Sequence, residues 1–82
     1  MTEVTYYVAL SFVMADDGPA PNEGIECMSA NAAIMRADSL LRIAGNVGAV
    51  AFSRTGDPAL GDFNDAVLLR AFGSVPSDLS GL

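Results

Sequence analysis

The sequence predicts a small α+β domain of ββαββ order, in which one helix covers one face of a mainly antiparallel four-stranded sheet. Apolar residues recur at every second position over residues 3–14 and at helical spacing over residues 30–44. Two later short runs, residues 48–54 and 66–72, have the composition of strands. A chain of 82 residues has room for one hydrophobic core, so we expect a single domain spanning residues 1–82.

The first strand is expected over residues 3–14, where β-branched and aromatic residues alternate with smaller or more polar ones. The next ten residues, ADDGPAPNEG, contain a D-G step and two prolines. These residues favour turns and interrupt strand pairing, so we expect a loop there. A short second strand, GIECM at residues 24–28, should follow this loop.

The helix is the clearest element of the sequence. Ser29 stands where an N-cap residue belongs, because its hydroxyl can accept from a free amide of the first turn. Asp38 and Arg42 form an i,i+4 pair with the acid toward the N-terminus, which is the favourable order. Gly45 or Asn46 can adopt the left-handed conformation that ends a helix. We therefore expect one helix that reaches to about residue 44 and packs closely through its many alanines.

The third strand, GAVAFSR at residues 48–54, and the fourth, AVLLRAF at residues 66–72, are joined by a segment rich in turn residues. With the helix as a right-handed crossover, the third strand lies parallel to the second. Placing the long first strand between them gives the strand order 2-1-3-4. Residues 74–82 are expected to form a short turn or a flexible tail.

The apolar pattern of the fourth strand predicts that the chain associates with itself. Val67 and Leu69 lie on one of its faces, and Leu68 and Phe72 on the other. One helix covers one face of a sheet, so the remaining face, expected to include Tyr7, would be larger than the apolar patch that monomers leave exposed. We therefore expect a homodimer formed through sheet faces or edges, with Tyr7, Leu68 and Phe72 in the interface.

The composition excludes several classes of function. Ten acids against four arginines give a net charge of −6, with no lysine, so the chain should repel nucleic acid and anionic membranes and attract basic partners. The absence of histidine and lysine removes Ser-His, Cys-His and Schiff-base chemistry. Cys27 is the single cysteine, and no signal peptide or membrane span is evident. We expect a cytoplasmic protein that is not an enzyme and uses no metal or cofactor.

The segment AFSRTGDPALGDFND, residues 51–65, raises the question of a binding loop. Ser53, Arg54 and Thr55 could hold an anionic ligand, since hydroxyls and a guanidinium bind carboxylates and phosphates. The favoured interpretation is a hairpin turn in which Arg54 is exposed and pairs with a nearby acid, such as Asp57. The acids of the segment lack the spacing of a calcium loop.

The chain also resembles a group of short uncharacterised bacterial proteins. The resemblance is carried by YYVALSFV, D-D-G, the helix start and above all AVAFSRTGDP, and it spans nearly the whole chain. It implies a free-standing bacterial domain and carries over no catalytic residue, because that group has no assigned activity.

These observations leave three hypotheses. The leading one is a homodimeric protein-interaction module with Arg54, Asp57 and the intervening turn as its recognition loop. The alternative is a binder of small anionic ligands that uses Ser53, Arg54 and Thr55. The third is an acidic antagonist that covers a basic surface of another protein.

Overall fold

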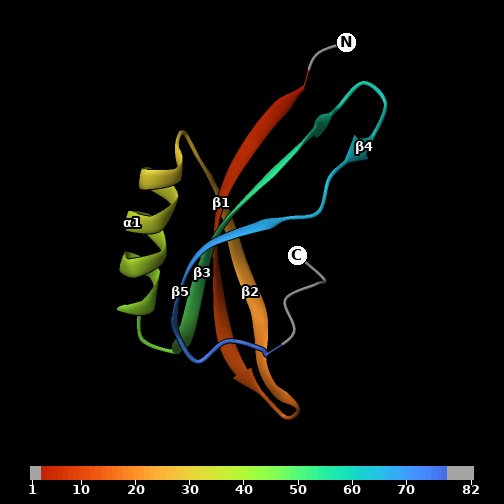
Figure 1. The fold of residues 1–82 in the computed structure, drawn as a ribbon. Coiled ribbons are helices and arrows are strands. Elements are labelled where there is room, and N and C mark those ends of the chain that lie inside the picture. Colours follow the sequence, from red (N-terminus) through yellow and green to blue (C-terminus); the bar gives the residue numbers. More distant parts are fainter. Residues whose placement is uncertain (1–2, 78–82) are drawn as a thin grey trace.

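The computed structural model describes residues 3–77 and contains one helix and one curled antiparallel sheet (Figure 1). The predicted α+β class is therefore confirmed. In chain order the elements are β1 (Val4–Ala15), β2 (Gly18–Cys27), α1 (Ala30–Leu41), β3 (Asn46–Asp57), β4 (Asp62–Phe63) and β5 (Val67–Gly73).

The sheet has β1 and β3 at its centre. The strands follow the order β2-β1-β3, and β4 and β5 both pair with the second edge of β3. Every neighbouring pair is antiparallel, so β2 and β3 run parallel to each other on either side of β1, with α1 as the crossover between them. This is the predicted order, with β5 as the expected fourth strand and β4 as a short addition.

The expected loop after the first strand is wrong, because β1 and β2 form a tight hairpin. Ala15 pairs with Gly18 across the two-residue turn formed by Asp16 and Asp17, and Gly18, directly after the turn, has a positive φ of 114°, which glycine adopts readily. Pro19 and Pro21 lie in β2, which is an edge strand. Their alternate spacing puts both missing N–H groups on the edge that faces away from β1, so the ladder between the strands survives.

The pairing of β1 with β2 is interrupted by one bulge. The register between β1 and β2 shifts once, between Leu10 and Phe12. Ser11, a buried polar residue, lies at this shift. The Ser11 hydroxyl accepts from the backbone N–H of Glu23 at 3.2 Å and donates to the Glu23 carbonyl at 3.4 Å. The side chain thus replaces ladder hydrogen bonds that the bulge removes.

The helix begins as predicted and ends three residues earlier. Ser29 accepts from the backbone N–H of Ala32 at 3.1 Å, and Arg42 bonds Asp38 at 3.0 Å. The helix ends at Leu41, and the Asn46 side chain donates to the Leu40 carbonyl at 2.8 Å, which satisfies a group of the last turn. Gly45, with φ of 95°, then turns the chain toward β3.

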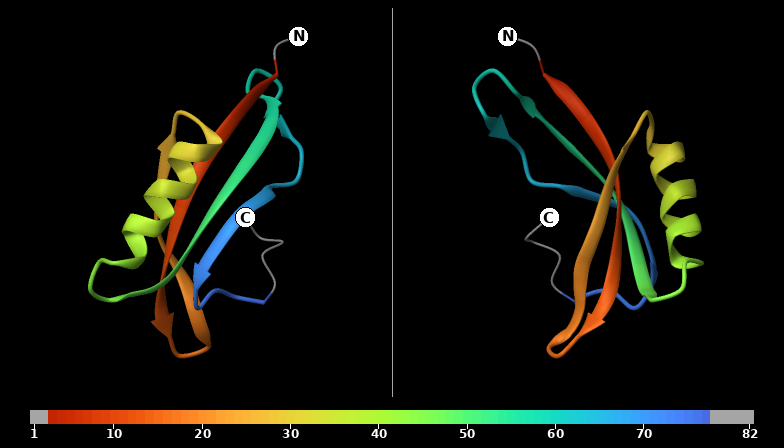
Figure 2. Two further views of the ribbon diagram at one scale, coloured as in Figure 1. Left: turned by 60° about the vertical axis from the view of Figure 1, so that its left-hand side comes forward. Right: turned by 180° about the vertical axis from the view of Figure 1, so that it is seen from behind.

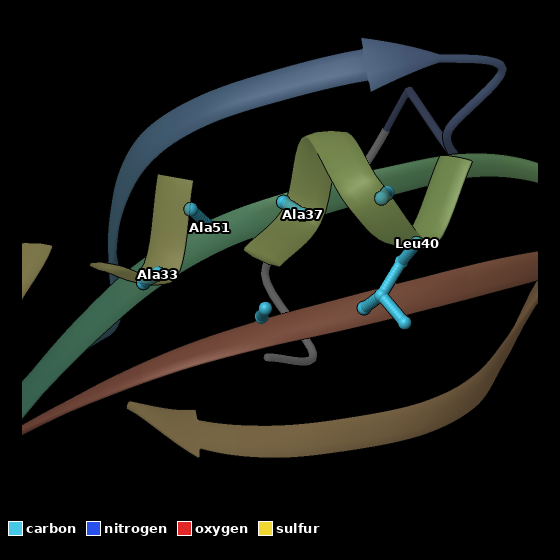
Figure 3. Packing of buried hydrophobic residues seen from close by; sticks show 6 residues of the cluster. Ala33, Ala37, Leu40 and Ala51 are labelled. Atoms are coloured by element: carbon cyan, nitrogen blue, oxygen red, sulfur yellow. The ribbon is translucent and has the colours of Figure 1, made fainter. Parts of the chain in front are cut away.

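The core under the helix is built largely from alanine (Figure 3). Small side chains let α1 lie close to the sheet, and Leu40 is the one large side chain among the buried residues there. This cluster consists of Ala9, Ala33, Ala37, Leu40, Ala49 and Ala51. Its members come from α1, β1 and β3, so the helix covers the two central strands.

The face opposite the helix is not bare, contrary to expectation. Phe12 and Val50 are buried there and Phe52 is 9% exposed. Ala66 and Val75 pack against them, from the chain on either side of β5. Figures 1 and 2 show how the curled sheet and the residues after β5 bring these segments together. The chain thus shelters much of this face itself.

The described part of the predicted tail turns back on the sheet. Ser74 donates its backbone N–H to Val47 at 2.8 Å, and Val75 packs as described above. Residues 78–82 lie outside the described residues. Within residues 3–77, no helix has the length and apolarity needed to cross a membrane.

The lengths of the elements explain the elongated shape of the molecule, which measures 41 × 25 × 16 Å. β1 and β3 have 12 residues each, and at about 3.3 Å per residue each is about 40 Å long. The helix also has 12 residues but spans about 18 Å. It therefore covers less than half of the central strands, and their remaining ends project past it (Figure 2).

Candidate functional site

The projecting end of the sheet carries a hollow in the described surface. It is about 450 Å³ in volume and is lined by Glu3, Gly56, Asp57, Leu60, Asp62 and Asn64. We call residues 56–64 the hairpin tip. The tip comprises the end of β3, the turn after it and β4, and it lies beside the start of β1, well away from α1 (Figure 1). Its lining includes three acidic residues and one exposed leucine, so the hollow is acidic and partly apolar.

The turn within the hairpin tip is held by its own hydrogen bonds. An oxygen of the Asp57 carboxylate accepts from the Ala59 backbone N–H at 2.9 Å. The Asp57 carbonyl accepts from the Leu60 N–H at 3.1 Å, and Gly61 takes a positive φ of 67°. These bonds are typical of an Asx turn. They fix the direction of the Asp57 side chain and leave Leu60 70% exposed at the end of the hairpin.

Gly56 is the residue that lets β4 cross close to β3. A Cβ placed at Gly56 would overlap the Asp62 carbonyl and come within 2.6 Å of the Phe63 Cα. Because both neighbours are backbone atoms, no side chain can move aside to make room. The Phe63 ring in turn packs against the Tyr6 ring, with 5.9 Å between centroids. Gly56 and this aromatic pair attach the tip to β1.

Four residues of the hollow lie outside the recognition loop predicted from the sequence, namely Glu3, Leu60, Asp62 and Asn64. Glu3 is more than fifty positions from the tip in the sequence, and the antiparallel pairing of β1 with β3 brings it there. Leu60, Asp62 and Asn64 sit among turn residues, where nothing in their local pattern marks them as pocket lining. The only sequence signal was the density of acids and glycines between residues 56 and 65.

Ser53, Arg54 and Thr55 do not form the loop that the anionic-ligand hypothesis requires, and the third strand runs past its expected end at Arg54. They belong to β3, where they pair with Tyr7, Tyr6 and Thr5 of β1, respectively. Successive side chains of a strand point to opposite faces, so Arg54 points away from the face that carries Ser53 and Thr55. The Thr55 hydroxyl also bonds the Thr5 hydroxyl at 2.8 Å. This arrangement does not gather the three side chains around one anion.

Arg54 is also less exposed than expected. The residue is half-buried, and its Nε atom is buried. The Arg54 side chain therefore packs against the sheet. The sequence had predicted that it would lie in solvent and pair with a nearby acid. Asp57, by contrast, does lie at the turn, as predicted, and lines the acidic hollow.

The residues predicted for a dimer interface separate into two groups. Tyr7 and Phe72 pack against the alanine cluster beneath α1, so their expected place on an uncovered face is wrong. Arg70 lies over the Phe72 ring at 5.5 Å from its centroid. Leu68 pairs with Phe52 and is 47% exposed, so it alone of the three remains on an open surface.

Residues 3–77 contain no group of three or more His, Cys, Asp or Glu side chains that could hold a metal ion. Cys27 is half-buried, and its thiol lies 3.6 Å from the Ile25 carbonyl. The hollow itself contains no hydroxyl, thiol or amine that could act as a nucleophile. Its residues are suited to binding cationic groups.

No protein-family model, no curated protein and no solved structure matches the chain. The resemblance to short bacterial proteins therefore stays a prediction. The role of the site has to be argued from its geometry and charge.

Proposed function

We propose that the chain is a small non-enzymatic interaction module of the cytoplasm that works as a homodimer and binds a basic segment of another protein at its hairpin tip. The observation that carries this proposal is the acidic hollow, which Glu3, Asp57 and Asp62 line together with the exposed Leu60. The tip projects from the sheet, so a partner can reach it without disturbing the core.

The chemistry of the hollow supports a lysine or arginine side chain as the bound group. Both have an apolar stem that can lie on Leu60 and a cationic head that can reach the carboxylates. The net charge of −6 adds a long-range field that draws cations toward the surface. Leu60, 70% exposed, adds apolar contact that an acidic surface alone would lack.

The anionic-ligand alternative is not proposed. It requires Ser53, Arg54 and Thr55 to converge, and β3 directs Arg54 away from the other two. The third hypothesis, an acidic antagonist of a basic surface, is a special case of the present proposal. It differs in the size of the surface that the partner would cover.

The proposal can be tested with a short peptide of alternating lysine and leucine, titrated into the isotope-labelled chain. We expect amide shifts centred on residues 56–64 and an affinity that falls as salt is raised, because screening weakens exposed charge pairs. Asp57→Asn together with Asp62→Asn should weaken binding by about tenfold. Asparagine at 57 keeps an oxygen that can accept from Ala59, so the turn is preserved.

The matched control removes two charges at the opposite end of β1. Asp16→Asn together with Asp17→Asn changes the net charge equally, and both residues are exposed in the β1–β2 turn. This variant should bind the peptide nearly as well as the parent. Equal losses in both variants would mean that net charge alone attracts the peptide, and the hairpin tip would then not be a site.

A further inference from the structure

The two edges of the sheet differ in how they are protected from pairing. β2 carries Pro19 and Pro21 and two exposed glutamates, all of which discourage an added strand. Each of the two edge strands also has one irregularity in its register, which in β5 falls at Leu69. β5 has the sequence VLLRAFG, with no proline and one charge. It pairs with β3 on one side, and within residues 3–77 no strand pairs with its other side.

The one charge of β5 does not guard its edge. Arg70 lies over the ring of its neighbour Phe72, at 5.5 Å from the centroid, so its guanidinium is held along the strand. Exposed edges are normally blunted by charges that stand out from the strand. Alternate backbone N–H and C=O groups of β5 point away from β3 and are available to a further strand.

Apolar side chains flank this edge on both faces of the sheet. Val67 pairs with Ser53 and Leu68 with Phe52, so the two side chains lie on opposite faces. Val67 is 59% exposed and Leu68 is 47% exposed. A strand added to β5 would cover both, in addition to pairing the backbone.

We propose that β5 pairs antiparallel with β5 of a second copy of this chain across a two-fold axis, which joins the two sheets into one. A two-fold interface brings the same surface of each copy together, and antiparallel pairing of identical edges meets this condition. This inference rests on the homodimer of the proposed function, and it names the surface that forms it.

The exposed area of the chain is large enough for a second copy to be the occupant. The chain exposes 5188 Å², whereas a self-contained monomer of 8.5 kDa exposes about 4,650 Å². The surplus is about 500 Å² for each chain. Two chains that bury it together reach about 1,000 Å², which is near the lower bound of a specific interface. The dimer is therefore expected to be weak and to depend on concentration.

Sedimentation equilibrium from micromolar to millimolar concentration tests the pairing on the intact chain. We expect the parent to approach twice the chain mass at the upper end. Val67→Lys should weaken association by about tenfold or more, because an edge lysine opposes pairing. The matched control is Met14→Lys, which makes the same charge change at a side chain that is 58% exposed, against 59% for Val67. This control should associate like the parent.

The outcomes distinguish the pairing of β5 from the homodimer itself. A dimer that Val67→Lys leaves intact would overturn β5 pairing but keep the homodimer, which would then use another surface. A monomer at every concentration would overturn both, while peptide binding at the hairpin tip would still stand or fall by its own titration. Circular dichroism checks that each variant folds, and Leu68→Lys serves as the second variant if Val67→Lys does not.

Discussion

Leu40 should be the most sensitive position under the helix. It is 3% exposed and is the one large side chain among the buried residues of the alanine cluster, so Leu40→Ala leaves a void that alanines cannot refill. Buried Leu→Ala changes cost about 2–5 kcal/mol. We expect about 3 kcal/mol here, and in a domain of this size that corresponds to a fall in Tm of about 12–24 °C.

Urea unfolding followed by circular dichroism measures this loss. Leu60→Ala is the matched control, because it makes the same chemical change at a side chain that is 70% exposed. It should change the free energy of unfolding by less than about 0.5 kcal/mol. Equal effects of the two variants would refute the account of the core, because α1 would then not be anchored to the sheet through Leu40.

Three further predictions concern single residues, each measured by urea unfolding. Ser29→Ala should cost about 1 kcal/mol through loss of the N-cap, and a neutral result would contradict the cap. Gly48→Ala should destabilise by more than about 2 kcal/mol, since its Cβ would overlap the Ser74 carbonyl; wild-type stability would mean that this approach is not tight. Arg42→Ala removes an exposed ion pair and should lower the free energy of unfolding by about 0.5 kcal/mol or less. Arg54→Ala removes a half-buried side chain and should lower it by about 1–3 kcal/mol. A larger loss for Arg42→Ala would contradict the exposed position of Arg42 and the half-buried position of Arg54.

Local signals were enough to predict the helix and the central strands. The cap at Ser29 and the spacing of the alanines depend on neighbours in sequence, so they could be recognised without the fold. The strand order followed from one general constraint, the right-handed crossover. The exact end of the helix could not be predicted in this way, because the contacts of its last turn include a bond from the side chain of Asn46, which lies beyond the helix, to the Leu40 carbonyl.

Effects that depend on sheet position could not be predicted in the same way. Pro19 and Pro21 resemble loop residues until β2 is known to be an edge strand. Ser53 to Thr55 resembled a loop because polar residues were followed by glycine, yet the pairing with β1 continues through Gly56. The burial of Phe12 depends on Val75, which the curl of the chain brings back.

The candidate site shows the same division. The acids and turn residues around Asp57 could be predicted as an exposed turn, and the structure has that turn. The hollow needed Glu3, which is distant in sequence, and the close crossing at Gly56. Both are properties of strand pairing, so the sequence pattern alone could not indicate them.

Amide hydrogen exchange along β5, measured at low and high protein concentration, tests the pairing of two copies most directly. If β5 pairs with β5 of a second copy, the alternate amides of Val67–Gly73 that point away from β3 should become more protected as the concentration rises, while the protection of the edge amides of β2 should not change. Exchange of those β5 amides at one fast rate at every concentration would contradict the account.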